Sequence, residues 1–592
     1  MKNEGSAKGI VWDLSGLYHG DADSELDKGL DTARERALCF AGSFKGKING
    51  QNLDAQTLLF AIREYESIHE KGMRPCLFAY LYHSADTRDH KGNRLLQKVR
   101  ETWSEISQVI AFFELEIKAL PEDFLKKLAA NHDLSRYRHF LLNQIQWKPY
   151  ALSEVEEKII KLGHLSGRDA FLSFYDQFTG ALSFSVEIEG ESVELNIYQA
   201  LSLLRSPDRS LREKTFDTFL QELEKHGPVF ENILNAILLA HHQEDVERGH
   251  PFPMHRIHLN NEVNESIIEN MMGVVEDYYP LARRYLRQKA RCLGLEKSKI
   301  TDIFALLKED SLLVNFSDAT KLILEAAEDL HPVFHSCVRE IFKNNRIDAE
   351  VRAGKQNGAF CKGMAPSLNP YISMSYAGNI SDLMTLAHEV GHGIHYRLCS
   401  EQSYVNFDPP PILAEAASTF MEMVVIEHLM KKKGYQKLRP MLLALQIEGI
   451  MTTVFRQNVL TRFEQTIHNK RRDHLLSAKE ICRLWWDENY RFYGEEVEME
   501  PGYRWGWTYI PHLFHRPFYC YSYIFGNLLS IMLFQNYQEK GDGFLETIID
   551  LLKTGSSRAP IKMIKEMGLD IEKRFWEPAF QYVEDLINRL NL

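Results

Sequence analysis

The sequence predicts a mainly α-helical protein with a small β element beside one histidine-rich helix. Through most of the 592 residues, apolar side chains recur every three or four positions, which is the spacing of one buried helix face. Only two short stretches alternate with the period of a strand. One further stretch, "TLAHEVGHGIHYRLCS" (385–400), would place three histidines on one helix face. The fold class is therefore helical, with β structure confined to short segments.

Helical periodicity is clearest in 99–117, where six apolar residues follow 3-4 spacing and predict a long amphipathic helix. Similar patterns predict helices over 54–68, 121–145, 153–177, 210–246, 264–293, 318–345, 412–433, 437–469 and 478–494.

Two stretches predict strands. In "ALSFSVEIEGESVELNI" (181–197), apolar and polar residues alternate on both sides of Gly190, which is typical of a β-hairpin. In "GAFCKGMAPSLNPYISMSY" (358–376), two strand-like runs flank a Gly/Pro loop just before the histidines. The second run, "PYISMSY", could bind an extended peptide as an added strand.

One soft domain boundary is expected near residue 200, where the hairpin ends and long helices resume. We predict an N-terminal helical lobe with the hairpin over 1–200, and a helical domain that carries the histidine motif over 201–592.

Composition excludes several classes of protein. The net charge of −12 argues against a nucleic-acid partner. The N-terminal residues lack the apolar core of a signal peptide, and no stretch of about 18 residues is free of charge, so no membrane span is expected. The eight cysteines are scattered without a C-x-x-C pair, which favours reduced thiols and a cytoplasmic location.

The histidine stretch contains H-E-x-x-H. His388 and His392 lie four positions apart, so on a helix both imidazoles can bind one zinc ion. Glu389 lies close enough to take a proton from a water molecule at that ion. The longer metzincin pattern is excluded, because it needs Gly and His where this chain has His395 and Leu398. The alternative is a surface helix with ordinary titratable histidines.

The surroundings of the motif favour a buried metal site. The helix is largely apolar, and buried histidines without partners would be costly. Gly391 and Gly393 each cost about 1 kcal/mol in a helix interior relative to alanine. Two such glycines indicate that another segment packs very close to this helix.

A third metal ligand is expected in "DPPPILAEAASTFMEMVV" (408–425). The prolines predict a helix that starts at about Ile412, and Glu415 and Glu422 then share one of its faces. We assign Glu415 as the third ligand and Glu422 as a carboxylate that orients a ligand histidine. A solvated acidic face is the alternative. Two other histidine-containing stretches, 241–250 and 468–474, are dense in charge and predict a solvated helix end and a solvated turn.

Several stretches together resemble the oligoendopeptidase F family, within the thimet oligopeptidase superfamily of zinc metallopeptidases. They are "LAHEVGHGIH" (386–395) followed by "LAEAASTFME" (413–422), "WDLSGLY" (12–18), "GKQNGAFC" (354–361), "PYISMSYAGNISDLMTLAHEVGH" (370–392) and "YIPHLFHRPFYCYSYIFGN" (509–527). The resemblance implies a large helical metallopeptidase with a deep channel that admits oligopeptides and excludes folded proteins.

Residue by residue, the resemblance implies one zinc ion per chain held by His388, His392 and Glu415, with Glu389 as the general base. It implies that Glu422 supports a ligand, and that His512 and a tyrosine stabilise the transition state. The tyrosine lies among Tyr519, Tyr521 and Tyr523, of which the first and third would share a helix face. His395 also matches a family position that is not a ligand, and we interpret it as a hydrogen-bonding structural histidine.

Three functions are compatible with these residues. The leading hypothesis is a cytoplasmic zinc endopeptidase for oligopeptides. The alternatives are a related dipeptidyl- or carboxypeptidase, and a peptide-binding relative without catalysis, against which the intact motif argues. The sequence predicts neither the cleavage preference nor the oligomeric state.

Overall fold

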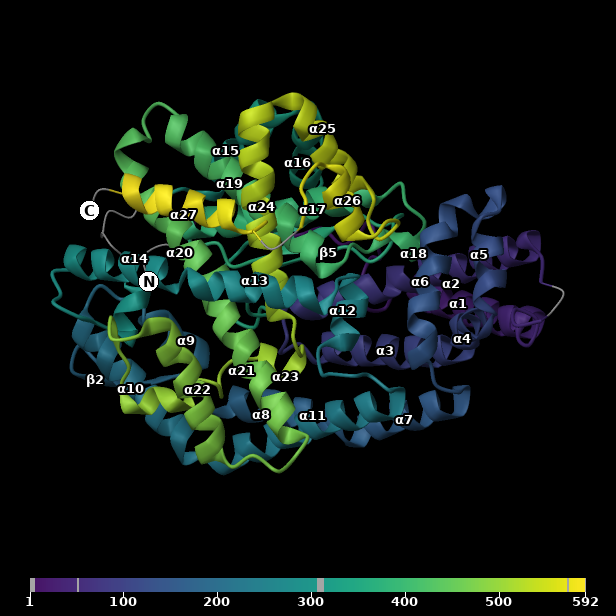
Figure 1. The fold of residues 1–592 in the computed structure, drawn as a ribbon, viewed down its shortest axis with the longest axis horizontal. Helices are drawn as coiled ribbons and strands as arrows, with labels where there is room; N and C mark the ends of the chain where they lie inside the picture. Colours follow the sequence, from purple (N-terminus) through teal and green to yellow (C-terminus); the bar gives the residue numbers. More distant parts are fainter. Residues whose placement is uncertain (1–5, 51–52, 306–312, 572–573, 591–592) are drawn as a thin grey trace. The chain divides into compact units, whose positions relative to one another are not determined.

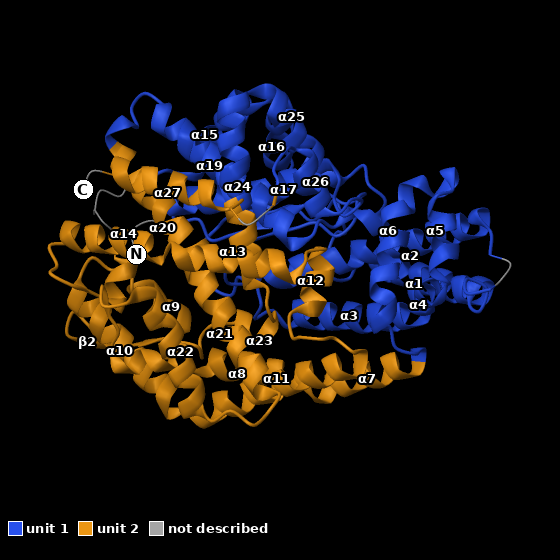
Figure 2. Ribbon diagram, viewed as in Figure 1, with its two compact units in different colours: residues 1–154, 311–437, 529–570 blue, residues 155–310, 438–528, 571–592 orange. Residues whose placement is uncertain are grey.

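The computed structural model describes residues 6–50, 53–305, 313–571 and 574–590, which are mainly helical as predicted (Figure 1). Two compact units divide the chain (Figure 2). Unit 1 comprises 1–154, 311–437 and 529–570, and unit 2 comprises 155–310, 438–528 and 571–592. The units interleave along the chain and so group residues differently from a division at residue 200. The predicted lobe and domain stay a prediction.

Unit 1 is built from two groups of helices and a three-stranded sheet. Its elements are α1 (Ser24–Phe44), α2 (Ala55–Ala85), α3 (His90–Ile110), α4 (Phe112–Ala119), α5 (Glu122–Ala129), η1 (His132–Tyr137), α6 (Arg138–Trp147), η2 (Lys148–Tyr150), α15 (Phe316–Leu330), α16 (Pro332–Lys343), β4 (Ile347–Asp348), β5 (Phe360–Lys362), β6 (Tyr371–Ser373), α17 (Ile380–Cys399), α18 (Tyr404–Phe407), α19 (Pro411–Lys431), α25 (Asp542–Lys553) and α26 (Pro560–Glu566).

Unit 2 is helical except for one hairpin and one very short strand pair. Its elements are α7 (Glu154–Ser166, which begins at the end of unit 1), α8 (Arg168–Ala181), β1 (Phe184–Ile188), β2 (Glu191–Leu195), α9 (Ile197–Leu203), α10 (Arg209–Lys225), α11 (Gly227–Arg248), α12 (His255–Asn261), α13 (Glu265–Asp277), α14 (Tyr279–Cys292), β3 (Ser298–Lys299), η3 (Ile300–Phe304), α20 (Arg439–Ile450), η5 (Met451–Phe455), α21 (Arg456–Arg471), α22 (Ala478–Tyr493), β7 (Val497–Glu498), η6 (Pro501–Trp505), α23 (His512–His515) and α27 (Glu577–Arg589). Two elements, η4 (Gln436–Leu438) and α24 (Cys520–Lys540), contain residues of both units.

Several helices predicted as continuous are broken, and proline explains three of the breaks. Pro228, Pro280 and Pro332 lie in the first turns of α11, α14 and α16. Proline lacks the N–H that a helix interior needs and disfavours helical geometry in the residue before it, but it fits the first turn of a new helix. The apolar periodicity continues across each break, so the sequence pattern alone does not reveal it.

The hairpin predicted in 181–197 is confirmed. β1 pairs antiparallel with β2, with Phe184 opposite Leu195 and Ile188 opposite Glu191. The connecting residues Glu189 and Gly190 both have positive φ, 53° and 87°, as a two-residue hairpin turn of the right twist requires.

The β element predicted beside the histidine helix is also confirmed. Its strand order is β4-β6-β5, and β5 and β6 pack against α17. β6 is the middle strand, bonded to β4 on one side and β5 on the other. The prediction that "PYISMSY" accepts a substrate strand is therefore wrong, because residues 371–373 have no free edge.

The segment 436–471 is the one described stretch that is long and apolar enough to cross a membrane by length and composition. Half of its most apolar window is buried inside the structure, and core helices pass the same test. The absence of a membrane span stays a prediction.

The stretch 241–250 is only in part the solvated helix end that its charge density predicted, because Glu247 is exposed but several of its neighbours are not. Glu244, Asp245 and His250 are buried. Glu244 forms ion pairs with Arg248 and Arg256, at 2.9 and 3.1 Å. In the second stretch, 468–474, His468 is buried, but residues 472–474 form an exposed turn as predicted. The charges are paired inside unit 2, which the local sequence does not show.

Candidate active site

The metal-binding candidates lie where α17 and α19 pack together in unit 1. α17 begins at Ile380, where Asn379 and Asp382 form a reciprocal cap, and α19 begins at Pro411. A Cβ on Gly391 would lie 2.6 Å from Ser418 Cα and 2.8 Å from Ala417 O. A Cβ on Gly393 would lie 2.7 Å from Ile341 Cδ1. The predicted close packing over this helix is confirmed, and at Gly391 the neighbour is the backbone of α19.

This contact brings the three predicted ligands together. The donor atoms of His388, His392 and Glu415 all lie within 4.8 Å of one another. The distances from Glu415 Oε2 are 3.8 Å to His388 Nε2 and 4.0 Å to His392 Nε2. Two imidazoles and one carboxylate that converge in this way fit the donor set of a zinc site with an open position. Among the residues that the structure describes, no other group of three such side chains converges.

Glu422 lies about two helical turns beyond Glu415 on α19 and contacts His388. Its Oε1 is 2.6 Å from His388 Nδ1, so Nε2 of that ring faces Glu415. Burial by itself would lower the pKa of His388, but the hydrogen bond and charge of Glu422 outweigh it and raise that pKa to about 10. A carboxylate on one ring nitrogen fixes the ring and makes the other nitrogen a better ligand.

Glu389 lies between the two histidines and is 5% exposed. Burial raises the pKa of its carboxyl to about 7, against the positive charge of His388 and with the added repulsion of Glu415 and Glu422. Its Oε2 has no hydrogen-bond partner among the described residues. A buried carboxylate oxygen without a partner is expensive, so it indicates a group that acts on a ligand.

His395 does not have the predicted hydrogen bonds. Its side chain is 1% exposed, and neither ring nitrogen finds a partner in the described part of the chain. Burial lowers its pKa to about 3, so the ring is neutral. Among the described residues, the structure therefore contradicts the interpretation of His395 as a hydrogen-bonding residue.

Unit 2 groups His512 with two of the three candidate tyrosines. His512 Nε2 lies 3.4 Å from Tyr523 Oη, and its ring is 6.4 Å from the ring of Tyr519, centroid to centroid. The rings of Tyr519 and Tyr523 are 5.1 Å apart. Burial lowers the pKa of His512, and the charges of Arg516 and His515 lower it further. The prediction that Tyr519 and Tyr523 share one face is confirmed.

Tyr521 is not part of that group. It is fully buried, and its Oη accepts from Asn261 Nδ2 at 2.8 Å and contacts His258 Nδ1 at 3.2 Å. It also donates to Ile257 O at 3.2 Å. These bonds to α12 occupy the hydroxyl, so the structure narrows the candidates to Tyr519 and Tyr523.

Sequence reasoning missed Glu464, which supports the turn before Tyr519. Phe518 has φ of +58°, a left-handed conformation that costs a non-glycine residue about 1–2 kcal/mol. Its N–H donates to Glu464 Oε1 at 2.8 Å, and its ring packs on His468 at 4.6 Å. Burial raises the pKa of Glu464 well above its ordinary value. The signal in the sequence that could have revealed Glu464 is a glutamate within the apolar pattern of the helix predicted over 437–469.

Comparison with known proteins gives the family of the chain. Residues 202–580 match the model of peptidase family M3, and residues 116–184 match a model described as oligopeptidase F. An oligoendopeptidase F homolog of Lactococcus lactis subsp. lactis (strain IL1403) is 26% identical, over 100% of this chain and 98% of its own. Oligopeptidase PepF of Bacillus subtilis (strain 168) is 25% identical, over 95% of this chain and 83% of its own.

Solved structures share the fold. The crystal structure of oligoendopeptidase-F from Enterococcus faecium has a TM-score of 0.74 at 23% identity, over 96% of this chain and 98% of that one. PZ peptidase A with an inhibitor has a TM-score of 0.79 at 15% identity, over 98% of this chain and 100% of that one. Since the M3 model covers more than half of the residues, the chain is a peptidase that belongs to family M3, in its oligoendopeptidase F branch.

Proposed function

We propose that the chain is a zinc-dependent endopeptidase that hydrolyses short oligopeptides, with one zinc ion held by His388, His392 and Glu415. The convergence of these three donors within 4.8 Å, beside a buried glutamate, is the observation that carries the proposal. The names of the relatives, oligoendopeptidase and oligopeptidase, support oligopeptides as the substrates.

Each side chain has a separate task in this proposal. When bound, zinc supplies Lewis acidity, which lowers the pKa of water and polarises a carbonyl. Glu389 accepts a proton from the attacking water and passes it to the leaving amine. Glu422 holds the His388 ring through Nδ1 and so keeps Nε2 turned toward Glu415.

The donors to the developing oxyanion are assigned to His512 and to Tyr523 or Tyr519. Burial and neighbouring positive charges lower the pKa of His512, so its ring is neutral at neutral pH and one nitrogen carries a proton to donate. Removing one such donor typically costs about 2.7–4 kcal/mol of transition-state stabilisation.

A mixture of random oligopeptides, analysed by mass spectrometry with and without a chelator, tests the zinc and the activity together. We expect internal cuts that stop when the metal is removed and resume when zinc is added. A peptide blocked at both ends separates an endopeptidase, which cuts it, from a dipeptidyl- or carboxypeptidase, which does not. Tight binding of the blocked peptide without any product would instead support a binding protein.

The substrate channel and the cytoplasmic location stay predictions. A stable folded domain, incubated with the enzyme at an equal concentration of peptide bonds, should remain intact if a channel limits entry.

A further inference from the structure

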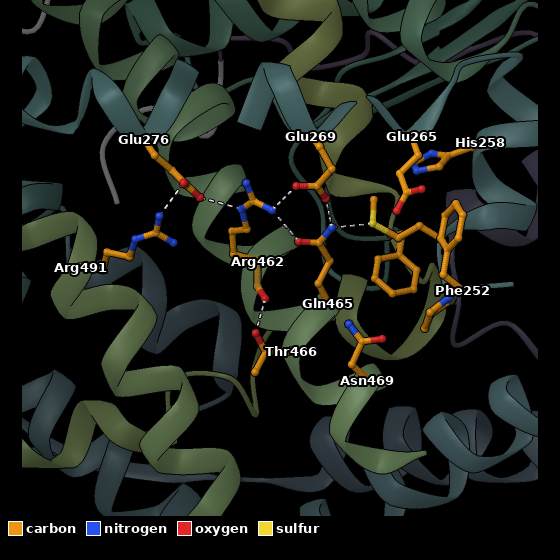
Figure 3. Close-up of a pocket in the computed structure, with 13 residues that line it drawn as sticks. Phe252, His258, Glu265, Glu269, Glu276, Arg462, Gln465, Thr466, Asn469 and Arg491 are labelled. Carbon is orange, nitrogen blue, oxygen red and sulfur yellow. Dashed lines mark hydrogen bonds and ion pairs between the residues drawn. The ribbon is translucent and has the colours of Figure 1, made fainter. Parts of the chain in front are cut away.

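Unit 2 contains a recess of about 430 Å³ that has no role in the reaction above. Figure 3 shows its walls, which come from α12, α13, α21 and α22 together with Phe252. The volume is within the range of about 300–1,000 Å³ that small-molecule sites occupy.

The positive charges in the recess are already neutralised. Arg462 bonds to Glu269 and to Glu276, each at 2.6 Å, and Arg491 also bonds to Glu276 (Figure 3). Glu265, at the start of α13, lines the recess and has no hydrogen bond or ion pair with any residue that the structure describes. The recess therefore has one carboxylate, that of Glu265, which does not pair with Arg462 or Arg491.

Hydrogen-bond accounting fixes the tautomer of His258, a buried residue that is 4% exposed. The Tyr521 hydroxyl has one proton and two lone pairs. It receives an N–H from Asn261, and it lies 3.2 Å from both Ile257 O and His258 Nδ1. The carbonyl can only accept, so all three contacts are hydrogen bonds only if Tyr521 donates to Ile257 and Nδ1 of His258 carries the proton. Nε2 is then an acceptor.

This acceptor belongs to a side chain that lines the recess. Nε2 of His258 has no hydrogen bond with any described residue, and Figure 3 draws His258 toward the same end of the recess as Glu265. Burial lowers the pKa of His258 to about 4, so the ring stays neutral and Nε2 keeps its lone pair at neutral pH.

The recess thus offers acceptors and one aromatic ring to a ligand. The acceptors are the Glu265 carboxylate and His258 Nε2, and the aromatic ring is that of the partly exposed Phe252. Carboxylate, imidazole acceptor and ring faces are the groups that stabilise a cation with several N–H donors. We propose that this recess binds a primary ammonium or guanidinium group of the kind carried by lysine, arginine or the N-terminus of a peptide.

Calorimetric titration of the full-length, metal-free protein tests binding without turnover, so the result is independent of the peptidase proposal. The probes are Nα-acetyl-lysine N-methylamide, its arginine counterpart, the uncharged norleucine counterpart, and glycine N-methylamide, which carries only an α-amine. We expect the lysine or arginine probe to bind if side chains are the source, and glycine N-methylamide if the N-terminus is. Norleucine should not bind. Binding of norleucine as tight as that of lysine, or no binding by any of the three cations, would overturn the proposal.

Variants locate the site. Glu265→Gln should weaken binding about two- to fivefold, the usual range for an exposed ion pair, and Glu265→Lys should abolish it. Glu247→Gln is the matched control, because Glu247 is exposed on α11 and lies outside the recess. Equal weakening by Glu265→Gln and Glu247→Gln would refute the location. Nitrogen-15 NMR of the histidine rings should show His258 protonated on Nδ1, with Nε2 shifting on addition of the lysine probe. A proton on Nε2 in the free protein would contradict the assignment.

Discussion

Replacing Gly391 with alanine should push α17 away from α19 and disturb the metal site. The new Cβ would lie 2.6 Å from Ser418 Cα and 2.8 Å from Ala417 O. These are backbone atoms, so no side chain can rotate away, and the cost should approach the upper part of the 1–3 kcal/mol range for overpacking, about 3 kcal/mol. Alanine returns about 1 kcal/mol of helix propensity. The expected net loss of unfolding free energy is about 2 kcal/mol.

The same displacement should weaken zinc binding. Glu415 lies on α19 within one turn of Ser418, so a shift at that contact moves its carboxylate away from His388 and His392. We expect zinc affinity to fall tenfold or more, the size of effect seen when the support of a metal ligand is lost. Denaturant unfolding of the metal-free protein measures the first effect, and competition with a chromophoric chelator measures the second.

Gly393→Ala is the matched control. Its Cβ would come closer than 3.0 Å only to Ile341 Cδ1, at the end of a side chain, and its next neighbours, Ile341 Cγ1 and Cys361 Sγ, lie at 3.6 and 3.8 Å. The gain in helix propensity and the small repacking cost should leave stability within about 1 kcal/mol of wild type. The reasoning is refuted if Gly391→Ala folds as stably and binds zinc as tightly as wild type, or if Gly393→Ala is the more damaging change.

Four further predictions concern single side chains. Glu389→Gln should keep zinc and lose nearly all turnover, and activity within tenfold of wild type would remove Glu389 as the base. Glu422→Gln should weaken zinc binding about 10–100-fold, because His388 loses its charged partner; unchanged affinity in chelator competition would contradict this role. His512→Ala and Tyr523→Phe should lower kcat far more than they raise KM. Tyr521→Phe should instead cost about 1–3 kcal/mol of stability, because it breaks buried hydrogen bonds, and should leave kcat near wild type. The reverse pattern would exchange the roles assigned to Tyr521 and Tyr523. Burial raises the pKa of Glu464 well above its ordinary value of 4.5, so the stability that the protonated group contributes is present below pH 4.5 and is lost as pH rises through the folded pKa. Glu464→Gln should therefore gain stability relative to wild type as the pH rises above 4.5 in urea unfolding. A difference that stays constant with pH would show that the group does not titrate on unfolding.

Much of the proposed metal site follows from local spacing. His388 and His392 face the same way because they lie about one helical turn apart. Gly391 and Gly393 indicate a closely packed neighbour, because glycine is unfavourable in a helix interior. The face shared by Glu415 and Glu422 likewise depends only on helical geometry. These features are periodic, and a helix has a fixed period, so the sequence predicts them whatever else the chain does.

Other features depend on partners that are distant in sequence. Three tyrosines alternate along 519–523, and only Asn261 and His258, about 260 positions earlier, show that the Tyr521 hydroxyl is bonded to α12. The charged stretch at 241–250 looked solvated because its partners come from other helices. The sequence predicts a strand in "PYISMSY", and residues 371–373 form one. Its position in the middle of the sheet depends on β4 and β5, which pair with it on either side.

The sequence by itself thus determined the helical class, the hairpin, the H-E-x-x-H pattern and the family. Tertiary structure alone decided that Tyr521 is a structural residue, that His395 has no hydrogen-bond partner in the described part of the chain, and that Glu464 holds a left-handed Phe518. The reason is physical: periodicity and propensity act between residues a few positions apart, whereas burial and hydrogen-bond partnership are settled by whichever segments the folded chain brings into contact.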